Sequence, residues 1–565
     1  MVEAQAYDLV IVGSGAGAVC AALFAKMRGL SVVVLEKTDR FGGSTAMSGG
    51  LIWLPDSGPM RRAGVEDSEE AGFTYMSACA DGGPASTPER QLAYLREGHA
   101  AIAFLEGQGM EFDYCDGYAD YHEGELPGAL ARGRAIEARM FDMRQLGDKA
   151  SWIRTAGAGD FSIPISVPEI AAICLNGKTW VSKFAFLKVG FRMMRNRLGK
   201  RLVRMGGAMQ GRLLRLAIDH DVEIHLGAGV TGLRVEAGRV VGVEALIGGQ
   251  PVALSARAGV ILNAGGFSHN RDMRRRYQGE KTTGEWSSAN PGDTGEIIEI
   301  AAAAGAALDS MAEAWWIPST RLPDGTLIFN NPLEMAKPHC IMVDGAGRRY
   351  VNEATSYVAI GRAMYARDAA VQALPSWLLL DAQHREKYRW GGQKGVPEAW
   401  VRDGYMIRAD SITELAGKCG LEPATLNDTV ERFNGFARTG VDQDFGRGAS
   451  AHHRFWGDPT HKPNPSLGTI EKPPFYAVRV QAGDVGTSGG LLTNEHGQVL
   501  RNDGSAIEGL YAAGNCTASV MGAAYPGPGA SIGASLIFAF AAAKHAYGEA
   551  SNHAIDPLKG PEIEE

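Results

Sequence analysis

The chain lacks the features by which membrane-spanning, secreted and metal-binding proteins are recognised. No apolar run reaches the roughly 18 residues that a membrane span needs. The opening MVEAQAY leads into an apolar segment without the pattern of a signal peptide. The seven cysteines are odd in number and form no CxxC pair, which argues against disulfides, a zinc site or a dithiol redox centre. The net charge of −8 argues against a nucleic-acid partner. We therefore expect a cytoplasmic protein that binds neither metal nor nucleic acid.

Glycine, in contrast, is abundant. It supplies 74 of the 565 residues, about twice its usual share in globular proteins. The glycines follow no collagen-like period, so we expect them to serve tight turns and places where the backbone closely approaches another molecule. A large bound cofactor is the simplest explanation of the excess.

A βαβ unit begins almost at the N-terminus. The run YDLVIV, residues 7–12, is typical of a buried parallel strand, and an alanine-rich helix and a second strand, SVVVLE, follow. Between strand and helix, Gly13, Gly15 and Ala18 form GxGxxA. Gly13 permits the tight turn, Gly15 lets the backbone approach a pyrophosphate, and Ala18 lets helix and strand pack closely. Glu36 ends the second strand, where an acid accepts hydrogen bonds from ribose hydroxyls. The unit predicts a dinucleotide site.

The residues around this unit favour FAD over NAD. The segment RFGGSTAMSGG, residues 40–50, places glycines and hydroxyls directly after the ribose acid, where they can follow a cofactor. A second glycine turn, at Gly514 and Asn515, lies near the other end of the chain. Two such cradles suit a large flavin held permanently better than NAD, which leaves the enzyme.

The expected fold class is α/β, with a Rossmann-type FAD-binding domain assembled from both ends of the chain. Its first part is expected to span residues 1–280, with a basic amphipathic insert at about 150–205, and its second part residues 486–565. Residues 281–485 contain more tryptophan, proline and charge, and are interpreted as an inserted α+β catalytic domain.

Four motifs together resemble one enzyme family. They are YDLVIVGSGAGAVCAAL, LEKTDRFGGSTAMSGG, RRYVNEATSY and AAGNCTASVMGAAYPGPGASIG. The chain resembles the FAD-dependent 3-ketosteroid Δ1-dehydrogenases (3-oxosteroid 1-dehydrogenases), within the fumarate reductase and succinate dehydrogenase flavoprotein superfamily. The first two motifs indicate the superfamily and the last two are more specific. The resemblance covers nearly the whole chain except about residues 150–205.

The resemblance implies FAD that is bound without a covalent bond. Superfamily members that attach the flavin covalently place a histidine in the early glycine cluster, where this chain has GGSTAMSGG. The residues expected to hold FAD lie in the glycine-rich segments and at the start of the last helix. They are Gly13, Ser14, Gly15, Ala16, Gly17, Ala18, Glu36, Lys37, Gly42, Gly43, Ser44, Thr45, Ser48, Gly49, Gly50, Ala264, Gly265, Gly514, Asn515, Ser531 and Ile532.

Desaturation next to a ketone needs a group that polarises the carbonyl, a base for the α-proton and a hydride acceptor. The resemblance implies that the Tyr525 hydroxyl and the Gly529 N–H hold the C3 oxygen, since two preorganised donors at a helix N-terminus stabilise an enolate. Tyr357 corresponds to the tyrosine that takes the C2 proton, and FAD N5 accepts hydride from C1. A quinone or another acceptor then takes the electrons. The alternative for Tyr525 is a turn residue that only packs against FAD.

The base needs assistance, because a tyrosine with a pKa near 10 is a poor base at neutral pH. The resemblance supplies a second tyrosine from the segment DYCDGYADYHEGE, which contains Tyr114, Tyr118 and Tyr121. Tyr121 is preferred because the family's residue lies in a comparable PDY-like or ADY-like stretch, and Tyr118 is the next choice. The spacing alone leaves the three open.

The implied reaction is 1,2-desaturation of ring A of a 3-ketosteroid. The family branch that acts at carbons 4 and 5 carries serine two residues after the clamp tyrosine, where this chain has Gly527. A 4(5)-dehydrogenase is therefore the first alternative. Three arginines, Arg348, Arg349 and Arg362, flank Tyr357 and keep open a fumarate reductase-like enzyme acting on a dicarboxylate. A flavin-binding scaffold without turnover is a further alternative.

Three other features have competing interpretations. Trp315 and Trp316 either line an apolar steroid pocket or belong to the core. Glu353 is expected to be a hydrogen-bond partner rather than an acid catalyst. Between Lys183 and Arg204 there are eight basic residues and no acidic one, and apolar residues recur there at helical spacing. This helix either docks on the inner face of the membrane as a peripheral anchor or packs on the flavin domain. The apolar stripe comprises Phe184, Leu187, Phe191, Met194, Leu198, Leu202 and Met205.

Overall fold

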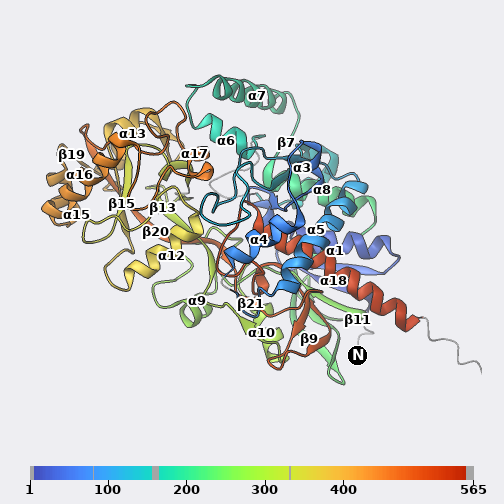
Figure 1. The fold of residues 1–565 in the computed structure, drawn as a ribbon. Helices are drawn as coiled ribbons and strands as arrows, with labels where there is room; N and C mark the ends of the chain where they lie inside the picture. Colours follow the sequence, from blue (N-terminus) through green and yellow to red (C-terminus); the bar gives the residue numbers. More distant parts are fainter. Residues whose placement is uncertain (1–4, 81, 156–163, 330–331, 555–565) are drawn as a thin grey trace, which may run out of the picture.

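The computed structural model describes residues 5–80, 82–155, 164–329 and 332–554 (Figure 1). Two sheets organise the molecule, one of eight strands and one of six, and they lie in different halves of it.

The eight-stranded sheet is built from both ends of the chain, as the sequence predicts. β1 (Gln5–Val12) pairs in parallel with β2 (Val32–Glu36) on one side and β11 (Gln250–Leu262) on the other. β8 (Glu223–Leu226) extends the sheet beyond β2, and β23 (Ala506–Ala512) extends it beyond β11, both in parallel. The buried valine and leucine runs of β1 and β2 explain why these strands form its centre. The remaining members pair antiparallel and are β9 (Ala228–Glu236), β10 (Arg239–Ile247) and β22 (Gln498–Leu500).

Helices cover one face of this sheet. α1 (Ala16–Met27) packs between the C-terminal helix α18 (Ala530–Ala554) and α8 (Met205–Asp219), and α5 (Pro88–Gly107) packs against α18. The contact of α1 with α18 requires Gly17, because a Cβ there would overlap the Ser535 carbonyl. The start of the chain and its last helix thus form one structural unit, and the predicted α/β class is confirmed.

The second sheet is antiparallel and lies at the other end of the molecule (Figure 1). Its longest strand, β20 (Phe475–Thr487), pairs with three others and ends at the cavity described below. The other members are β13 (Ala314–Arg321), β14 (Leu327–Phe329), β15 (Cys340–Val343), β16 (Ser376–Leu380) and β19 (Met406–Ala409). α12 (Tyr357–Asp368) packs on β13. The boundaries predicted at 280 and 485 stay a prediction.

Two helices, α6 (Val167–Ile173) and α7 (Trp180–Arg197), form the predicted amphipathic insert, whose residues 156–163 lie outside the described ranges. α7 stands at the edge of the molecule with α6 beneath it (Figure 1). The predicted stripe is solvent-exposed from Phe184 to Leu198, so it does not pack on the flavin domain. Leu202 and Met205 depart from the stripe because they are buried in β7 (Leu202–Val203) and at the start of α8.

None of the helices in the described ranges combines the length and the apolarity that a membrane crossing demands.

Candidate active site

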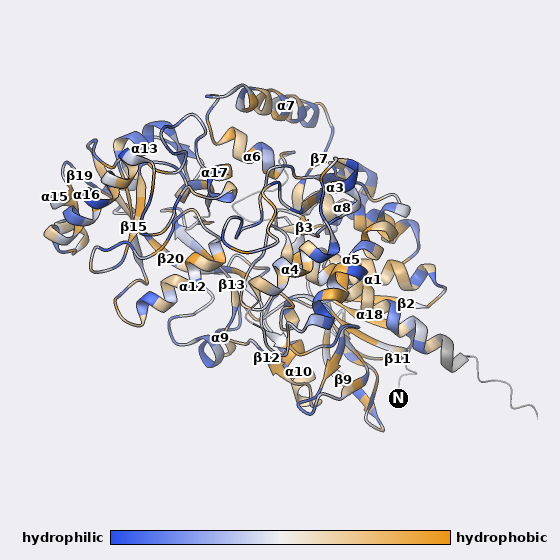
Figure 2. Cartoon of the chain, viewed as in Figure 1, coloured by the Kyte–Doolittle hydropathy of each residue, from blue (hydrophilic) through white to orange (hydrophobic). Residues whose placement is uncertain are grey.

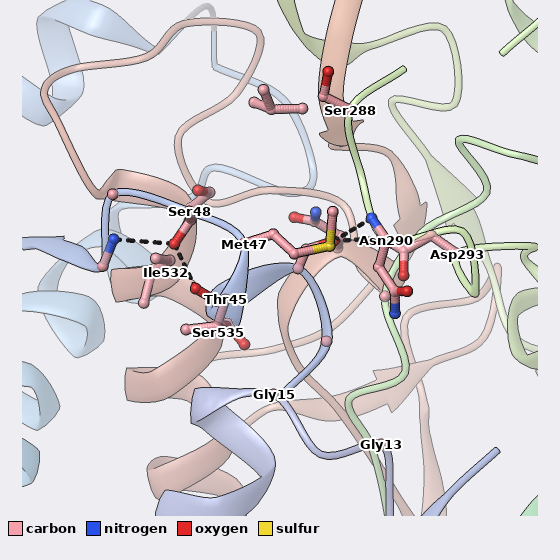
Figure 3. Close-up of a pocket in the computed structure, with 18 of the residues that line it drawn as sticks. Gly13, Gly15, Thr45, Met47, Ser48, Ser288, Asn290, Asp293, Ile532 and Ser535 are labelled. Carbon is pink, nitrogen blue, oxygen red and sulfur yellow. Dashed lines mark hydrogen bonds between the residues drawn. The ribbon is translucent and has the colours of Figure 1, made fainter. Parts of the chain in front are cut away.

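A cavity of about 440 Å³ opens at the carboxyl ends of β1 and β2, where α/β folds usually bind their ligands. Segments from all parts of the chain line it. Gly13, Gly15 and Thr45 lie on one side, Asn290 and Asp293 on another, and α18 contributes Ile532 and Ser535 (Figure 3).

The GxGxxA turn shapes one end of the cavity. Gly13 has φ +104°, and a Cβ there would overlap the carbonyl oxygen of Asn263, so the position requires glycine. At Gly15 the nearest atoms to a Cβ are 3.4 Å away or more, which leaves the backbone open to the cavity. Ser14 Oγ donates to Glu36 Oε2 at 2.6 Å, and Glu36 is buried at the end of β2. The turn and the acid therefore lie as a pyrophosphate and a ribose require.

The opposite wall contains two acids that the sequence analysis missed, Asp293 and Glu296. Asp293 is 3% exposed and accepts a hydrogen bond from Ser44 Oγ at 3.1 Å. Burial, opposed by this hydrogen bond, raises the pKa of Asp293 to about 7. Lys37 Nζ donates to Thr294 Oγ1 at 2.6 Å and pairs with Glu296. The motif GDTGE, residues 292–296, contains both missed acids and was a visible signal, because it is another glycine-rich turn with acids.

Most of the predicted FAD residues line this cavity. Five do not: Ala16, Gly17, Ala18, Gly42 and Gly514.

Two of these five residues, Ala18 and Gly42, make hydrogen bonds to residues that line the cavity. The Ala18 N–H donates to Asn263 Oδ1 at 2.9 Å, and the amide of Asn263 donates to the Ala513 carbonyl at 2.7 Å. Asn263 thus ties α1 to the end of β23. Gly42 takes the left-handed conformation, and its N–H donates to Ser14 Oγ. These contacts hold the cradle in shape.

Three tyrosines meet at the other end of the cavity. Tyr121 follows β4 (Phe112–Tyr114), Tyr357 opens α12, and Tyr525 precedes α18. Their ring centroids are 5.4 Å apart for Tyr357 and Tyr525, 5.6 Å for Tyr121 and Tyr357, and 5.7 Å for Tyr121 and Tyr525. Residues far apart in the sequence are therefore brought together as predicted.

The loop before α18 fixes the position of Tyr525. Its hydroxyl lies 3.0 Å from Ser531 Oγ, in the first turn of α18, and its ring meets Trp315 edge-on at 5.0 Å. Gly529 has φ +98°, and a Cβ there would overlap the backbone of Leu51. No described residue accepts a hydrogen bond from the Gly529 N–H. The loop therefore presents one hydroxyl and one free N–H beside a helix N-terminus, which favours negative charge.

Tyr118 forms the next link after Tyr121. Their hydroxyls are 3.1 Å apart, and Tyr118 also lines the cavity. Tyr114 does not line it, because its hydroxyl donates to the carbonyls of Arg132 and Gly133. Of the three candidate helpers, only Tyr121 has its ring against Tyr357.

Burial raises the pKa of Tyr357 well above 10, and the neighbouring Tyr525 and Tyr118 raise it further. A hydrogen bond from Tyr121 opposes this shift by lowering the pKa of Tyr357. Burial also raises the pKa of Tyr121. Of the three candidate helpers, Tyr121 is therefore the one placed to favour the phenolate form of Tyr357, a form that burial alone makes less populated than in an exposed tyrosine.

The walls beyond the tyrosines are apolar. They include Val167, Ile170, Phe329, Leu333 and Trp456. Among the described lining residues the only basic side chain is Lys37, at the ribose end.

The three arginines that flank Tyr357 in sequence lie outside the cavity. Arg348 is exposed, Arg349 pairs with Glu353 and Asp442, and Arg362 contacts the Ala523 carbonyl and Glu313. The cavity therefore has no described cation near the tyrosines for a dicarboxylate.

Trp315 and Trp316 belong to the core. Both are under 5% exposed; the Trp315 indole donates to Asn515 Oδ1 at 3.0 Å, and Trp316 packs on Tyr365. Neither lines the large cavity; the tryptophan that does line it is Trp456. The sequence offered no pattern that distinguishes these roles.

Glu353 is a structural partner, as expected. Although burial raises its pKa, the guanidinium groups of Arg349 and Arg447 hold the pKa below its usual value. Its carboxylate accepts from Arg349 at 2.9 Å and from Arg447 at 2.9 Å.

Known proteins match nearly the whole chain. The FAD binding domain family matches residues 8–532. A 3-oxosteroid 1-dehydrogenase of Mycobacterium tuberculosis is 40% identical, over 96% of this chain and 98% of its own. A 4-oxocyclohexanecarboxylate 2-dehydrogenase of Sinomonas cyclohexanicum is 34% identical, over 97% and 94%.

A solved structure agrees with these matches. A 3-ketosteroid delta1-dehydrogenase from Sterolibacterium denitrificans, in complex with 1,4-androstadiene-3,17-dione, superposes with a TM-score of 0.90 at 36% identity, covering 96% of this chain and 100% of that one. The fold, the flavin-type cradle and these matches agree, and the chain belongs to the FAD-dependent 3-ketosteroid dehydrogenase family.

Proposed function

We propose that the protein is an FAD-dependent 3-oxosteroid 1-dehydrogenase, which introduces a double bond between C1 and C2 of a 3-ketosteroid. The observation that carries this function is the meeting of Tyr121, Tyr357, Tyr525 and the free Gly529 N–H at the apolar end of the cofactor cavity. That set provides a carbonyl clamp, a base and a helper in a site suited to a hydrocarbon.

The cradle has the shape and the donors that FAD needs. The backbone at Gly15 is open to the cavity, Glu36 lies where a ribose would lie, and the N-terminus of α18 faces inward with Ser531 and Ile532. No histidine or cysteine is among the described lining residues, which supports binding without a covalent bond. Bound FAD supplies the acceptor, at N5, for the hydride that leaves C1.

Tyr525 and Gly529 act as the clamp on the C3 oxygen. Both donors belong to one loop that is fixed at Ser531, so their spacing is set before the steroid arrives. The negative charge that develops on the oxygen is stabilised by two hydrogen bonds and by the N-terminus of α18. This stabilisation makes the C2 proton more acidic.

Tyr357 takes the C2 proton while Tyr121 stabilises the phenolate form of Tyr357. The direction of the pKa effect of Tyr121 on Tyr357 supports this pairing. Tyr118, 3.1 Å from the Tyr121 hydroxyl, extends the chain of hydroxyls and offers the proton a next acceptor. The two electrons finally pass to a quinone or another acceptor.

The position of Gly527 supports the 1,2 reaction over the 4(5) reaction. A Cβ at this residue would overlap the indole of Trp53, so the serine of the other branch would not fit here without displacing that ring. The apolar wall argues against a dicarboxylate. It argues equally against the carboxylated ring named for the Sinomonas relative, because no described cation lines the cavity near the tyrosines.

We also propose that the enzyme works in the cytoplasm, held at the inner face of the membrane through α7. Its seven free thiols suit a reducing compartment. The large apolar side chains of α7 are exposed to solvent, as in helices that lie in an anionic interface. Hydrophilic and hydrophobic residues are mixed along this helix (Figure 2).

Anaerobic mixing of the yellow protein with androst-4-ene-3,17-dione tests the reaction. We expect the flavin absorbance to bleach and the product to be the 1,4-diene-3-one. A 4(5)-dehydrogenase is tested with the matching 5α-reduced 3-ketone, which it would convert to the 4-ene. If no 3-ketosteroid bleaches the flavin, while fumarate reoxidises chemically reduced enzyme, the steroid assignment is wrong.

A further inference from the structure

The exposed apolar surface of the molecule is concentrated on one helix. Thirteen large hydrophobic side chains are exposed among the described residues, and nine of them lie between Trp180 and Leu198. Leu198 is 78% exposed, Trp180 74% and Leu187 69%. A soluble surface rarely gathers apolar side chains in this way without a binding partner.

The orientation of α7 is the reverse of that of an ordinary surface helix. The side chains buried against the protein are the small ones, Ser182, Ala185 and Val189. At 100° per residue, Trp180, Leu187 and Phe191 lie on the opposite side of the helix. The helix therefore turns its large apolar residues outward, which costs free energy in water and is stabilising only against an apolar phase.

Basic residues border this apolar face on both sides. On the same helical wheel Lys188 and Arg195 lie on one edge, and Lys183 and Arg197 on the other. No described carboxylate forms an ion pair with any of these four residues. An apolar stripe between two basic edges matches the acyl region and the anionic headgroups of a bilayer.

The same hairpin forms part of the cavity wall. α6 packs against α7, and Arg192 of α7 pairs with Glu169 of α6 at 2.6 Å. On α6, Val167 and Ile170 line the apolar end of the cavity. One short helix thus separates the outward apolar face from the substrate site.

We propose that the α6–α7 hairpin is the entrance of the substrate, through which a steroid dissolved in an anionic bilayer passes into the cavity without crossing water. This inference rests on the proposed function, since it concerns the route to the same site. In this proposal the partner of the exposed apolar face of α7 is lipid, not another protein.

The test uses the holoenzyme and vesicles of phosphatidylglycerol and phosphatidylcholine. The variant Leu187→Asp/Phe191→Asp changes only outward side chains, and Val441→Asp, at a residue 60% exposed elsewhere, is the matched control. We expect the double variant to co-sediment with vesicles about a hundredfold more weakly than wild type. Pure phosphatidylcholine, or high salt, weakens wild-type binding because the basic edges lose their partners.

The entrance is tested by the rate of flavin reduction with a long-chain 3-ketosteroid loaded in the vesicles. The double variant is expected to lose at least tenfold in this rate, and to match wild type with androst-4-ene-3,17-dione in vesicle-free buffer. If vesicle binding is lost but the vesicle-delivered rate is unchanged, the entrance is refuted. If the wild-type protein does not bind vesicles, lipid is the wrong partner. The same conclusion follows if the wild-type protein forms a dimer in the absence of lipid and the double variant is a monomer. If androst-4-ene-3,17-dione in vesicle-free buffer does not reduce the flavin of the wild-type enzyme, the proposed function itself is refuted.

Discussion

Removing the Tyr525 hydroxyl is the most direct test of the carbonyl clamp. In Tyr525→Phe the ring keeps its contacts with Trp315, Tyr121 and Tyr357, at centroid distances of 5.0, 5.7 and 5.4 Å. The fold loses the hydrogen bond between this hydroxyl and Ser531 Oγ, which contributes about 1 kcal/mol, and the long 3.5 Å bond that the hydroxyl accepts from the Ser531 N–H. Removal of one preorganised donor to a developing oxyanion costs roughly 2.7–4 kcal/mol in the transition state. We therefore expect flavin reduction to slow about 10²–10³-fold.

The assay is anaerobic stopped-flow recording of flavin bleaching at saturating steroid, with FAD content checked by absorbance. Tyr114→Phe is the matched control, because it removes a hydroxyl from the same chemical group outside the cavity. That control is expected to reduce its flavin at the wild-type rate. A Tyr525→Phe rate within tenfold of wild type, with full FAD content, would refute the clamp.

Three further results are expected. Because burial raises the pKa of Tyr357 above 10, its phenolate fraction grows about tenfold per pH unit below that pKa. The kcat/KM of the wild-type enzyme should therefore rise with pH from 6 to 9, and Tyr357→Phe should abolish the rise. A flat wild-type profile would contradict this. Gly13→Ala should yield protein without bound flavin, since a Cβ at this position overlaps Asn263. The control Gly107→Ala, with open space around its Cβ, should keep its flavin and stay yellow. The ratio of flavin absorbance to protein absorbance measures the flavin content of both variants. Glu353→Gln should lower the free energy of unfolding by about 3–5 kcal/mol, because it leaves Arg447 buried without its carboxylate partner and Arg349 with Asp442 alone. Glu471→Gln, at an exposed pair, should cost at most about 1 kcal/mol, and thermal melts of the two variants that coincide would show that the network is not stabilising.

The sequence predicts the flavin half well because its signals are local. The glycines at 13 and 15, the acid at 36 and the buried strands around them follow from spacing alone, since each must meet a cofactor at a βαβ turn. Asp293 and Trp456 were not predicted, because their places in the cavity depend on which distant segments fold onto it. The outward direction of α7 was not predicted for the same reason. A stripe at helical spacing shows that a helix has an apolar side, but only the packing of Ala185 and Val189 shows that this side faces away from the protein.

The two halves of the molecule contribute unequally to the proposed chemistry. Tyr121 and the clamp loop are joined within the flavin half, because the Tyr121 N–H donates to the Pro526 carbonyl at 2.9 Å and the Tyr75 hydroxyl donates to the same oxygen at 2.6 Å. Tyr357 alone comes from the other half, at the first turn of α12. Its distance from the C2 proton is therefore set by how α12 sits against the clamp loop, where Arg362 donates to the Ala523 carbonyl. In the proposed mechanism the clamp and the helper are joined by these hydrogen bonds, and the base is brought to them by the packing of the second half. We therefore expect proton abstraction to depend on the contact between the halves more than hydride transfer does.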